Sequence, residues 1–458
     1  MYQPMIWTII LLVLAVIWIV LGTTKFKIHP FLVLLYASVG LGLLANVPLI
    51  HLLDLLTKGF GKTFENIGLL IVFGTLIGVF LESSGATITI ARYLIKKLNR
   101  LPLPFAISAI GYVVAIPVFC DSAFIILSSL NKSLAQEGRT PPLALTIALS
   151  TGLFAPHVLV PPTPGPLAAA AQLELDNLFL LILWGGLVAF ILVLIGALYS
   201  NHLNNRQLSG MNQSTEVTPN TPDKKQIAEE SMPGFFASIS PIAVPIIMMA
   251  LGTLITVFPW NLRSLNIIIE FLSSPNVALF VGLLIAMNLN KISTKGHTNS
   301  NSMRFQKGLK LAAPVLLITA MGGAFGSIIK ELPLTEYLSQ YDSLAHLGLI
   351  LPFVIAAILK TAQGSSTVAI ITSASIVFPI LDQLGMTSEL EKVWVIIAIG
   401  TGSMTVSHAN DSYFWIVSQM GGIDIKTAYR HHTLATLIQG LSGLIVVLIL
   451  STLSGWWS

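Results

Sequence analysis

Residues 151–166 read TGLFAPHVLVPPTPGP, and five of these positions are proline within an otherwise apolar part of the chain. Each proline lacks a backbone N–H and clashes with a continuing helix, so the stretch cannot form one uninterrupted helix. In a bilayer, broken backbone is tolerated only where protein or a water-filled cavity satisfies its polar groups. We therefore predict that one helix runs to about Phe154, that another begins near Leu167, and that the gap lies inside the protein.

Composition places this stretch in a membrane protein. Of the 458 residues, 54% are hydrophobic and 10% are charged, whereas soluble domains carry about 25% charged residues. Apolar stretches of about 20 residues, the length that crosses a bilayer as a helix, recur from end to end. The sequence thus predicts an all-α polytopic membrane protein. The lone Cys120 cannot form an internal disulfide.

The basic residues indicate an orientation. The first 21 residues lack the features of a cleaved signal peptide, and we predict that they form a retained first helix. Lys25 and Lys27 follow this helix, which places the N-terminus outside under the positive-inside rule. Most of the 24 basic residues then fall in cytoplasmic loops, and the C-terminus is also predicted to lie outside. This assignment requires two segments that enter and leave the bilayer on the same side.

These two segments are predicted to be re-entrant helical hairpins. Residues 103–130 have basic residues at both ends and IPVFCDSAF in the middle, which fits a hairpin that enters from the cytoplasm. Residues 346–381 lie between acidic segments and contain LKTAQGSSTVA, which fits a hairpin that enters from the outside. The two hairpins therefore have opposite orientation.

The two halves of the chain resemble each other in other places as well. Three features recur in the same order: FGTLIG at 73–78 and GGAFGS at 322–327, a hairpin tip at Asp121 and at 363–366, and TGLFAPH at 151–157 and TGSMTVSH at 401–408. Inverted repeats with discontinuous helices near the midplane are typical of secondary transporters.

This pattern predicts two repeats and a linker. The N-terminal repeat covers 1–200 and contains the first hairpin and a broken helix at 143–175. Residues 201–236 are polar and are predicted to form a cytoplasmic linker. The C-terminal inverted repeat covers 237–458 and contains the second hairpin and a broken helix at 393–419.

The hairpin tips and the helix breaks are predicted to meet at one substrate site. Free N–H groups at the start of a half-helix attract anions, and the second break, GTGSMTVSHANDSYF at 400–414, is rich in hydroxyl and amide groups. Such a lining suits a small polyhydroxylated anion. The candidate substrate-binding residues are Ser122, His157, Thr163, Gly165, Lys360, Gln363, Gly364, Ser365, Ser366, Thr367, Ser403, His408, Asn410 and Asp411.

Ionisable residues at membrane depth are costly and are functional candidates by default. Asp121, at the first hairpin tip, is the candidate proton-coupling residue; the alternative is a structural helix cap. Lys360 either attracts the carboxylate of the substrate or pairs with Asp411 or Asp121. His157 and His408 either act on the substrate or are simply buried and hydrogen-bonded.

Two further lysines, Lys58 and Lys62, are expected in a solvated loop. No metal site and no cofactor is predicted.

Four of these stretches carry a resemblance to a known family: GFGKTFENIGLLIVFGTLIG at 59–78, VPPTPGP at 160–166, KTAQGSSTVA at 360–369 and SHANDSYFW at 407–415. Together they resemble the gluconate permease family of proton symporters, within the ion-transporter superfamily. The resemblance implies proton-coupled uptake of gluconate or related sugar and hydroxy acids, and of D-serine in one branch. It also implies a bacterial inner membrane, a homodimer, and a transport domain that moves as an elevator.

The residues at the hairpin tips bear on whether protons or sodium ions are coupled to transport. Sodium-coupled members of the superfamily carry Ser-Asn-Thr at both tips, whereas this chain has Cys120–Asp121–Ser122 and Gly364–Ser365–Ser366–Thr367. This departure favours protons.

Other functions remain as alternatives. The chain has no H-E-x-x-H metal motif and no G-x-S-x-G nucleophile elbow, so an enzyme is not predicted. A D-serine or glycerate symporter of the same family is one alternative, and a cation/proton antiporter on the same architecture is another. The expected partners are a small carboxylate, protons and the lipid bilayer, and no nucleic acid.

Overall fold

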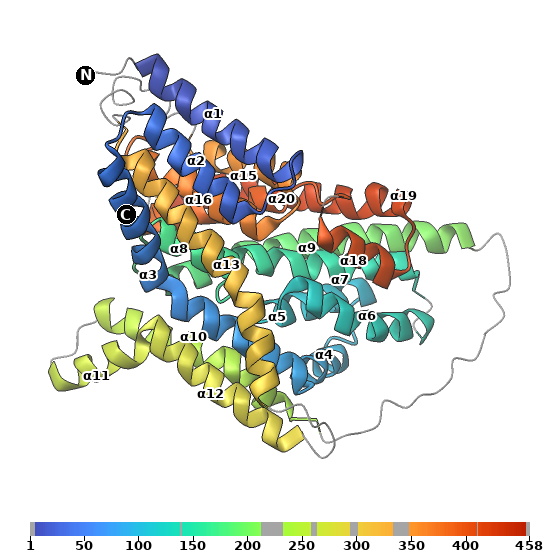
Figure 1. Ribbon diagram of the computed structural model, residues 1–458. Helices are drawn as coiled ribbons and strands as arrows, with labels where there is room; N and C mark the ends of the chain where they lie inside the picture. The colour runs from blue at the N-terminus through green and yellow to red at the C-terminus, as the bar shows by residue number, and fades with distance from the viewer. Residues whose placement is uncertain are drawn as a thin grey trace.

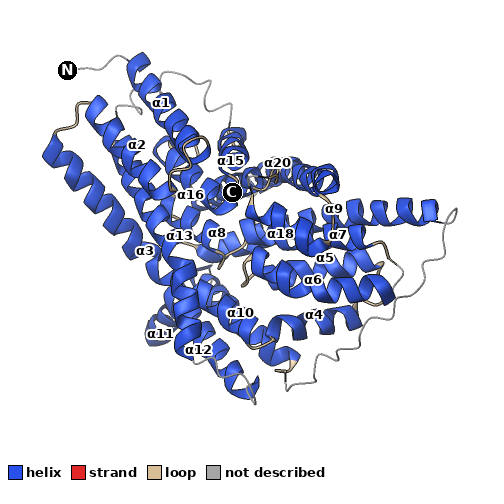
Figure 2. Ribbon diagram, turned by 45° about the vertical axis from the view of Figure 1, so that its right-hand side comes forward, coloured by secondary structure: helices blue, strands red, loops and turns tan. Residues whose placement is uncertain are grey.

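The computed structural model describes residues 5–137, 140–211, 232–257, 263–293, 301–332, 348–409 and 411–454. Within these ranges every regular element is a helix and no strand occurs, as Figures 1 and 2 show. The all-α prediction is confirmed for this part of the chain. The N-terminal helices are α1 (Met5–Thr24), α2 (Pro30–Leu44), α3 (Leu49–Ser83), α4 (Ala86–Lys97), α5 (Leu103–Ala115), α6 (Cys120–Glu137), α7 (Pro142–Leu159), α8 (Pro164–Gln172) and α9 (Leu178–Met211).

The C-terminal helices begin with α10, which follows the polar segment in the middle of the chain. They are α10 (Phe235–Val257), α11 (Arg263–Ser273), α12 (Pro275–Ser293), α13 (Asn301–Lys330), α15 (Ile350–Gln363), α16 (Ser366–Val377), the 3-10 turn η2 (Phe378–Ile380), α17 (Glu389–Ser403), α18 (Ser412–Gly421), α19 (Ile425–Thr427), the π-helical turn η3 (Ala428–Thr433) and α20 (Leu434–Ser454).

Several helices are long and apolar enough to cross a bilayer. The described residues contain five such helical segments, or seven if two bent pairs each count as one span. In the most apolar part of Pro142–Gln172, 94% of the residues are buried, whereas in the most apolar part of Phe235–Thr253 only 28% are buried. The proline-rich segment therefore lies in the interior, while α10 presents exposed apolar side chains such as Ile247 and Leu251, as a lipid-facing helix does.

The two helix breaks occur in α7–α8 and in α17–α18. The first break, residues 160–163, is shorter than predicted, because α7 continues past Phe154 to Leu159 and α8 already begins at Pro164. Pro156 lies inside α7 and removes only the ladder bond to the Gly152 carbonyl, which a helix with buried neighbours tolerates. The second break, residues 404–411, separates α17 from α18.

The predicted hairpin segments are pairs of consecutive helices. Residues 116–119 join α5 to α6, and α6 runs to Glu137, beyond the predicted end at 130. Gly364, in the left-handed conformation with φ of 81°, and Ser365 join α15 to α16. Of the predicted second segment, residues 346 and 347 lie outside the described residues.

The helices of the two halves make corresponding contacts. Helix α5 packs on α7 as α15 packs on α17, and α7 packs on α9 as α17 packs on α20. Across the halves, α18 packs on α6, and α8 packs on α16. Each half-helix that follows a break therefore lies against the second helix of the opposite pair.

Helices α3 and α13 pack side by side in antiparallel directions. Gly59 lies against Ala324, and Leu76 lies against Gly308 further along. Lys307 of α13 pairs with Glu82 near the end of α3 at 2.8 Å.

Helix α3 also approaches the first break closely. A Cβ on Gly74 would lie 2.7 Å from the Pro162 carbonyl oxygen, and a Cβ on Gly78 would overlap the Pro117 carbonyl oxygen. Only glycine allows this approach, so α3 fixes the position of the first break and of the turn between α5 and α6.

A charged cluster joins three parts of the chain near residue 174. Lys62 pairs with Glu174 at 2.8 Å, and Lys392 donates to the Glu174 carbonyl oxygen at 2.8 Å. Glu389 accepts hydrogen bonds from the backbone N–H groups of Asp176 and Asn177. The cluster therefore connects α3, the α8–α9 loop and the start of α17.

Two expectations from the sequence differ from these helix bounds. Lys58 and Lys62 lie within α3 and not in a loop, because the apolar pattern continues through KGFGKTFENIG. The predicted linker, 201–236, begins as helix, because α9 continues to Met211. Residues 212–231 lie outside the described residues.

Candidate functional site

A buried ion pair lies where the end of α15 meets the second break. The Nζ atom of Lys360 lies 2.6 Å from Oδ2 of Asp411 and donates to the Gly364 carbonyl oxygen at 2.8 Å. The Lys360 side chain is 0% exposed and that of Asp411 is 5% exposed. Of the two partners predicted for Lys360, the structure selects Asp411.

The second break supplies most of the groups that hold Asp411. Ser407 donates to Oδ2 of Asp411 at 2.6 Å, and the backbone N–H of Tyr413 donates to Oδ1 at 3.0 Å. Asp411 is thus the N-cap of α18 as well as the partner of Lys360. Removing a charge from water is costly unless it is paired and hydrogen-bonded, and both conditions hold here.

Val406 marks this break as strained. Its φ is 45°, in the left-handed region that β-branched residues rarely adopt. Such backbone costs about 1–3 kcal/mol and is found mainly at functional sites.

The hydrogen-bonded groups continue beyond Ser407 into the interior. Nε2 of His432 lies 3.1 Å from Oγ of Ser407, and Nδ1 of His432 lies 3.3 Å from Oγ of Ser150. The Tyr413 hydroxyl donates to the Ser150 carbonyl oxygen at 2.9 Å. Residues from α7, the second break, α18 and η3 therefore form one buried network.

His432 and Ser150 were not predicted from the sequence. The available signal was a pair of adjacent histidines, His431 and His432, directly before an apolar helix of 21 residues.

The turn between α5 and α6 also faces the second break. The Ser412 hydroxyl lies 3.4 Å from Oδ2 of Asp121, and the Cys120 thiol lies 3.7 Å from Oδ1 of Asp121. Asp121 is half-buried and Ser412 is exposed. This turn therefore brings a second carboxyl group close to the ion pair, since Ser412 follows Asp411 directly.

Other predicted polar residues line the same region. His408 lies with Nε2 2.9 Å from the Thr361 carbonyl oxygen. The buried side-chain amide of Gln363 has no hydrogen-bond partner at either atom, and Nδ1 of His157 has none. Unpaired buried polar atoms are costly, and they occur where a ligand or water supplies the partner.

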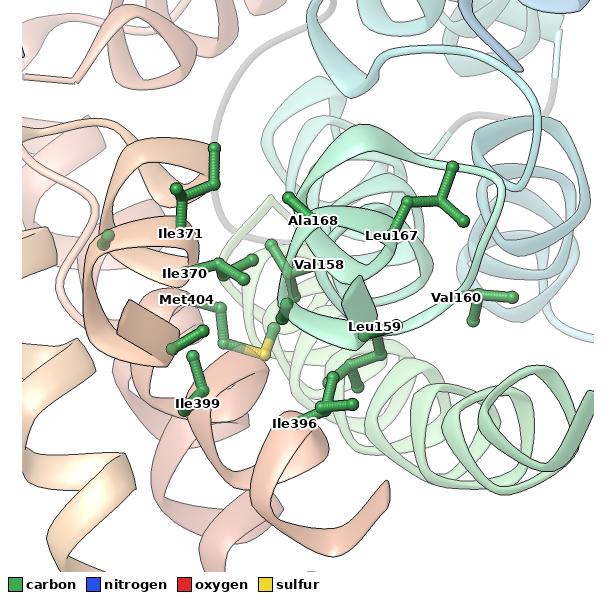
Figure 3. Packing of buried hydrophobic residues seen from close by; sticks show 14 of the residues in the cluster. Val158, Leu159, Val160, Leu167, Ala168, Ile370, Ile371, Ile396, Ile399 and Met404 are labelled. Atoms are coloured by element: carbon green, nitrogen blue, oxygen red, sulfur yellow. The ribbon is translucent and has the colours of Figure 1, made fainter. Parts of the chain in front are cut away.

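The first break is apolar, in contrast to the second. Figure 3 shows Val158 beside Ile370 and Met404, and Leu159 beside Ile396, while Val160 points away from this group; all six side chains are buried. Thr163 donates to the Val160 carbonyl oxygen at 2.6 Å, and Gly165 lies against Ile370 and Thr367 of α16. The Thr163 hydroxyl is thus occupied within the break itself.

The remaining candidates can now be placed. Gly364, Ser365, Ser366 and Thr367 form the α15–α16 turn and the start of α16; Ser365 accepts from the Val368 N–H at 3.3 Å. Ser403 donates within its own helix to the Gly400 carbonyl oxygen. Ser122 lies in the first turn of α6, next to Asp121. Asn410 lies outside the described residues.

The structure therefore gathers the candidates unevenly. Lys360 and Asp411 are in direct contact, and Asp121 and His408 lie at the edges of the same region. Thr163 and Ser403 are engaged locally. In the described part of the chain, no three His, Cys, Asp or Glu side chains come together as a metal ion would require.

Apolar spanning helices and buried charges beside a helix break define a membrane transport protein. The chain belongs to the GntP family of permeases, because residues 7–453 match that family. The family consists of permeases, so the predictions of a transporter and of a protein that is not an enzyme are confirmed, as is the family resemblance. The setting is a membrane and the cargo is a small molecule.

Individual relatives cover nearly the whole chain. An uncharacterized permease of Haemophilus influenzae is 33% identical over 453 residues, which cover 96% of this chain and 91% of the relative. The D-serine transporter DsdX of Escherichia coli strain K12 is 30% identical, with 97% and 98% covered. A gluconate permease of Zymomonas mobilis is 28% identical, with 96% of each chain covered.

A solved structure has the same fold. The YdaH transporter of Alcanivorax borkumensis superposes with a TM-score of 0.63 at 17% sequence identity, over 92% of this chain and 97% of that one.

Proposed function

We propose that this permease takes up small hydroxy or sugar acids such as gluconate together with protons. The observation that carries the proposal is the buried Lys360–Asp411 pair at the contact of α15 with the second break. A cation held there by a single carboxylate can exchange that carboxylate for the one on a substrate. The names of gluconate permeases among the relatives support the same substrate class.

The proposed site centres on Lys360 and keeps the other residues predicted from the sequence. In this proposal Lys360 binds the substrate carboxylate. The other residues supply hydrogen bonds or space for the substrate; they are Ser122, His157, Thr163, Gly165, Gln363, Gly364, Ser365, Ser366, Thr367, Ser403, His408, Asn410 and Asp411. The unpaired amide of Gln363 supports its role as a hydroxyl ligand. Asp121 is the proton-coupling residue in this proposal, since it lies beside the second break and is only half-buried.

We also propose that the architecture is an inverted repeat with two re-entrant hairpins, α5–α6 and α15–α16. The crosswise contacts α6–α18 and α8–α16, together with the antiparallel α3–α13 pair, support this assignment. A two-fold axis in the membrane plane relates such repeats and reverses the direction of corresponding helices.

The finer features of the membrane setting are proposals too. We place the protein in a bacterial inner membrane, as the family resemblance implies, and both termini outside, as the distribution of basic residues indicates. A homodimer and an elevator movement of the transport domain rest on the family resemblance.

D-serine is the second candidate substrate. The identity of 30% to a D-serine transporter over 97% of the chain favours it. D-serine carries a carboxylate and a hydroxyl group, so the same Lys360 site would bind it, while Asp411 or Asp121 would face its ammonium group.

Uptake into proteoliposomes tests these proposals. Purified protein is reconstituted, the outside is acidified, and labelled gluconate, glycerate and D-serine are supplied separately. We expect accumulation of at least one acid, with loss of accumulation when a protonophore collapses the pH gradient. If none of the three accumulates, and a monovalent cation is instead exchanged for protons, the protein is an antiporter and the proposal is wrong.

A further inference from the structure

His432 belongs to a continuous series of polar contacts that begins at Lys360 and ends at Ser150. The series runs from Lys360 to Asp411 at 2.6 Å, to Ser407 at 2.6 Å, to His432 at 3.1 Å and to Ser150 at 3.3 Å. Every residue in it is buried, and His432 is 0% exposed. A titratable ring this deep in the protein, linked to the ion pair by a single hydroxyl, has no role in the site described above.

The positions of the hydrogen atoms in this series of hydrogen bonds can be assigned by counting protons. Ser407 has one hydroxyl proton, and it donates that proton to Asp411. The Ser407 oxygen must therefore accept from His432, so Nε2 of His432 carries a proton.

The other ring nitrogen can exist in two states without movement of any heavy atom. Oγ of Ser150 lies 3.3 Å from Nδ1 of His432 and 3.0 Å from the Ile147 carbonyl oxygen. When the ring is neutral, Ser150 donates to Nδ1. When the ring is protonated, Nδ1 donates to Ser150, whose hydroxyl then rotates toward Ile147. Both protonation states are fully hydrogen-bonded, and only one hydrogen changes direction.

The two states differ in the charge that the site presents. With a neutral ring, the positive charge of Lys360 and the negative charge of Asp411 cancel. With a protonated ring, the network carries a net charge of +1, which favours an anion in a low-dielectric interior. Imidazole is the side chain that changes charge between pH 5 and 8 when unperturbed.

The charged and titratable groups around His432 come from several elements. Asp411 and Lys360 are linked to His432 through Ser407. The ring centroids of Tyr413, in α18, and His432 lie 5.6 Å apart. Cys120 and Asp121 of α6 lie beyond Ser412. On its own turn, the adjacent His431 points elsewhere and contacts the Tyr199 hydroxyl at 3.1 Å.

We propose that His432 binds the coupling proton and that this proton is what opens Lys360 to the substrate carboxylate. The Nε2 proton passes to Oγ of Ser407 as the Ser407 proton passes to Oδ2 of Asp411. His432 is then neutral with its proton on Nδ1, Asp411 is a neutral acid, and Lys360 keeps one unpaired positive charge. The carboxylate of the substrate replaces Asp411 as its counter-ion.

This inference rests on the proposed function and assigns separate roles to two residues. Asp121, which is half-buried and beside the exposed Ser412, exchanges the proton with water. His432 receives the proton in the interior and passes it through Ser407 to Asp411 as the substrate binds. Anion and proton are thereby taken up together, because neither alone leaves the buried site neutral.

The test is the pH dependence of gluconate affinity for the full-length purified protein, measured by calorimetry between pH 5 and 8. Gluconate remains an anion over this range, so any dependence belongs to the protein. In the wild type we expect the Kd to rise about tenfold per pH unit once the imidazole is mostly neutral. In His432→Gln the Kd should change less than twofold over the whole range.

The neighbouring histidine provides the control. His431→Gln should keep the slope of the wild type, because His431 contacts Tyr199 and not Ser407. Ser407→Ala, which cuts the link and leaves His432 in place, should also flatten the slope, and it carries the test if His432→Gln fails to fold.

The outcomes separate this inference from the proposed function. A slope that survives in His432→Gln or Ser407→Ala overturns the role of His432, and so does a wild type without a slope; in both cases proton-driven uptake can still stand. If the wild type shows neither a slope nor proton-driven uptake, the proposed function itself is wrong and the inference falls with it.

Discussion

The two helix breaks, 160–163 and 404–411, are made by different means. Prolines interrupt the first, where Pro161, Pro162 and Pro164 remove backbone donors and the surrounding side chains are apolar. The second contains no proline; the Lys360–Asp411 pair, hydrogen bonds and the left-handed Val406 hold it open.

This difference indicates that the two breaks have different roles. A break set by covalent geometry keeps its shape at any protonation state, whereas a break held by an ion pair depends on the charges that hold it. We therefore expect the first break to serve as a fixed wall, positioned by α3, and the second to respond to protons and substrate. The first three predictions below test this difference and the fourth provides a comparison outside both breaks; they run from the largest expected effect to the smallest.

Replacing Asp121 with Asn should abolish accumulation of substrate under a pH gradient, because an amide cannot carry the proton. Exchange of substrate across the membrane should continue, since the second break is intact. The measurement compares uptake and counterflow in proteoliposomes. Asp54→Asn, at an exposed acid of α3 that pairs with Lys58, should retain both activities. Normal accumulation in Asp121→Asn would remove this carboxyl group from the proton path.

Replacing Asp411 with Asn should lower the free energy of unfolding by about 3–5 kcal/mol, because Lys360 would be left as an unpaired buried charge. Thr163→Val at the first break removes one hydrogen bond and should cost about 1 kcal/mol. Unfolding of both variants in detergent measures the difference. A carboxylate ligand should stabilise Asp411→Asn more than the wild type, since it supplies the missing counter-ion. Equal stability of the two variants would contradict the contrast between the breaks.

Replacing Gly74 with Ala should destabilise the protein by about 1–3 kcal/mol, because the new methyl group meets the Pro162 carbonyl oxygen. Gly61 lies in the same helix with open space around it, so Gly61→Ala should be neutral or stabilising by up to about 1 kcal/mol. Thermal unfolding of the two variants distinguishes them. If Gly74→Ala unfolds like Gly61→Ala, the first break is not a fixed wall.

The Lys62–Glu174 pair lies outside both breaks and should matter least. The hydrogen bond from Lys62 holds the pKa of Glu174 below its ordinary value, against the opposing effect of burial. A depressed carboxyl pKa stabilises the fold above the unfolded value of about 4.3, and this stabilisation is lost as the pH falls through the folded value. Glu174→Gln should therefore cost about 0.2–1 kcal/mol at pH 7, and this cost should shrink as the pH falls through the folded pKa of Glu174. A melting difference that does not shrink as the pH is lowered would contradict this assignment.

Much of the fold could be predicted because it depends on local chemistry. Pro161 and Pro162 prevent α7 from continuing, Pro164 and Pro166 fit the first turn of α8, and apolar stretches of about 20 residues indicate spanning helices. The extent of α7 could not be predicted from those rules, because Pro156 is tolerated only through the packing of its neighbours.

The site was less predictable because its contacts join distant parts of the chain. Membrane depth marked Lys360, Asp411 and Asp121 as functional, but the choice of partner for Lys360 depends on tertiary contacts. His432 reaches Ser150 across 282 positions of sequence, and no local pattern indicates such a contact. The sequence therefore identified the charged residues of the site, but their hydrogen-bond partners depend on the tertiary structure and could not be predicted from it.

Cys120 gives the protein one practical property. It is the only cysteine of the chain and is buried as the first residue of α6, directly beside Asp121. We therefore expect the wild-type protein to react slowly with maleimides, so that a cysteine introduced on its surface would be the main site labelled by a fluorophore or spin label. Any slow reaction that Cys120 itself shows would report how often the turn between α5 and α6 opens.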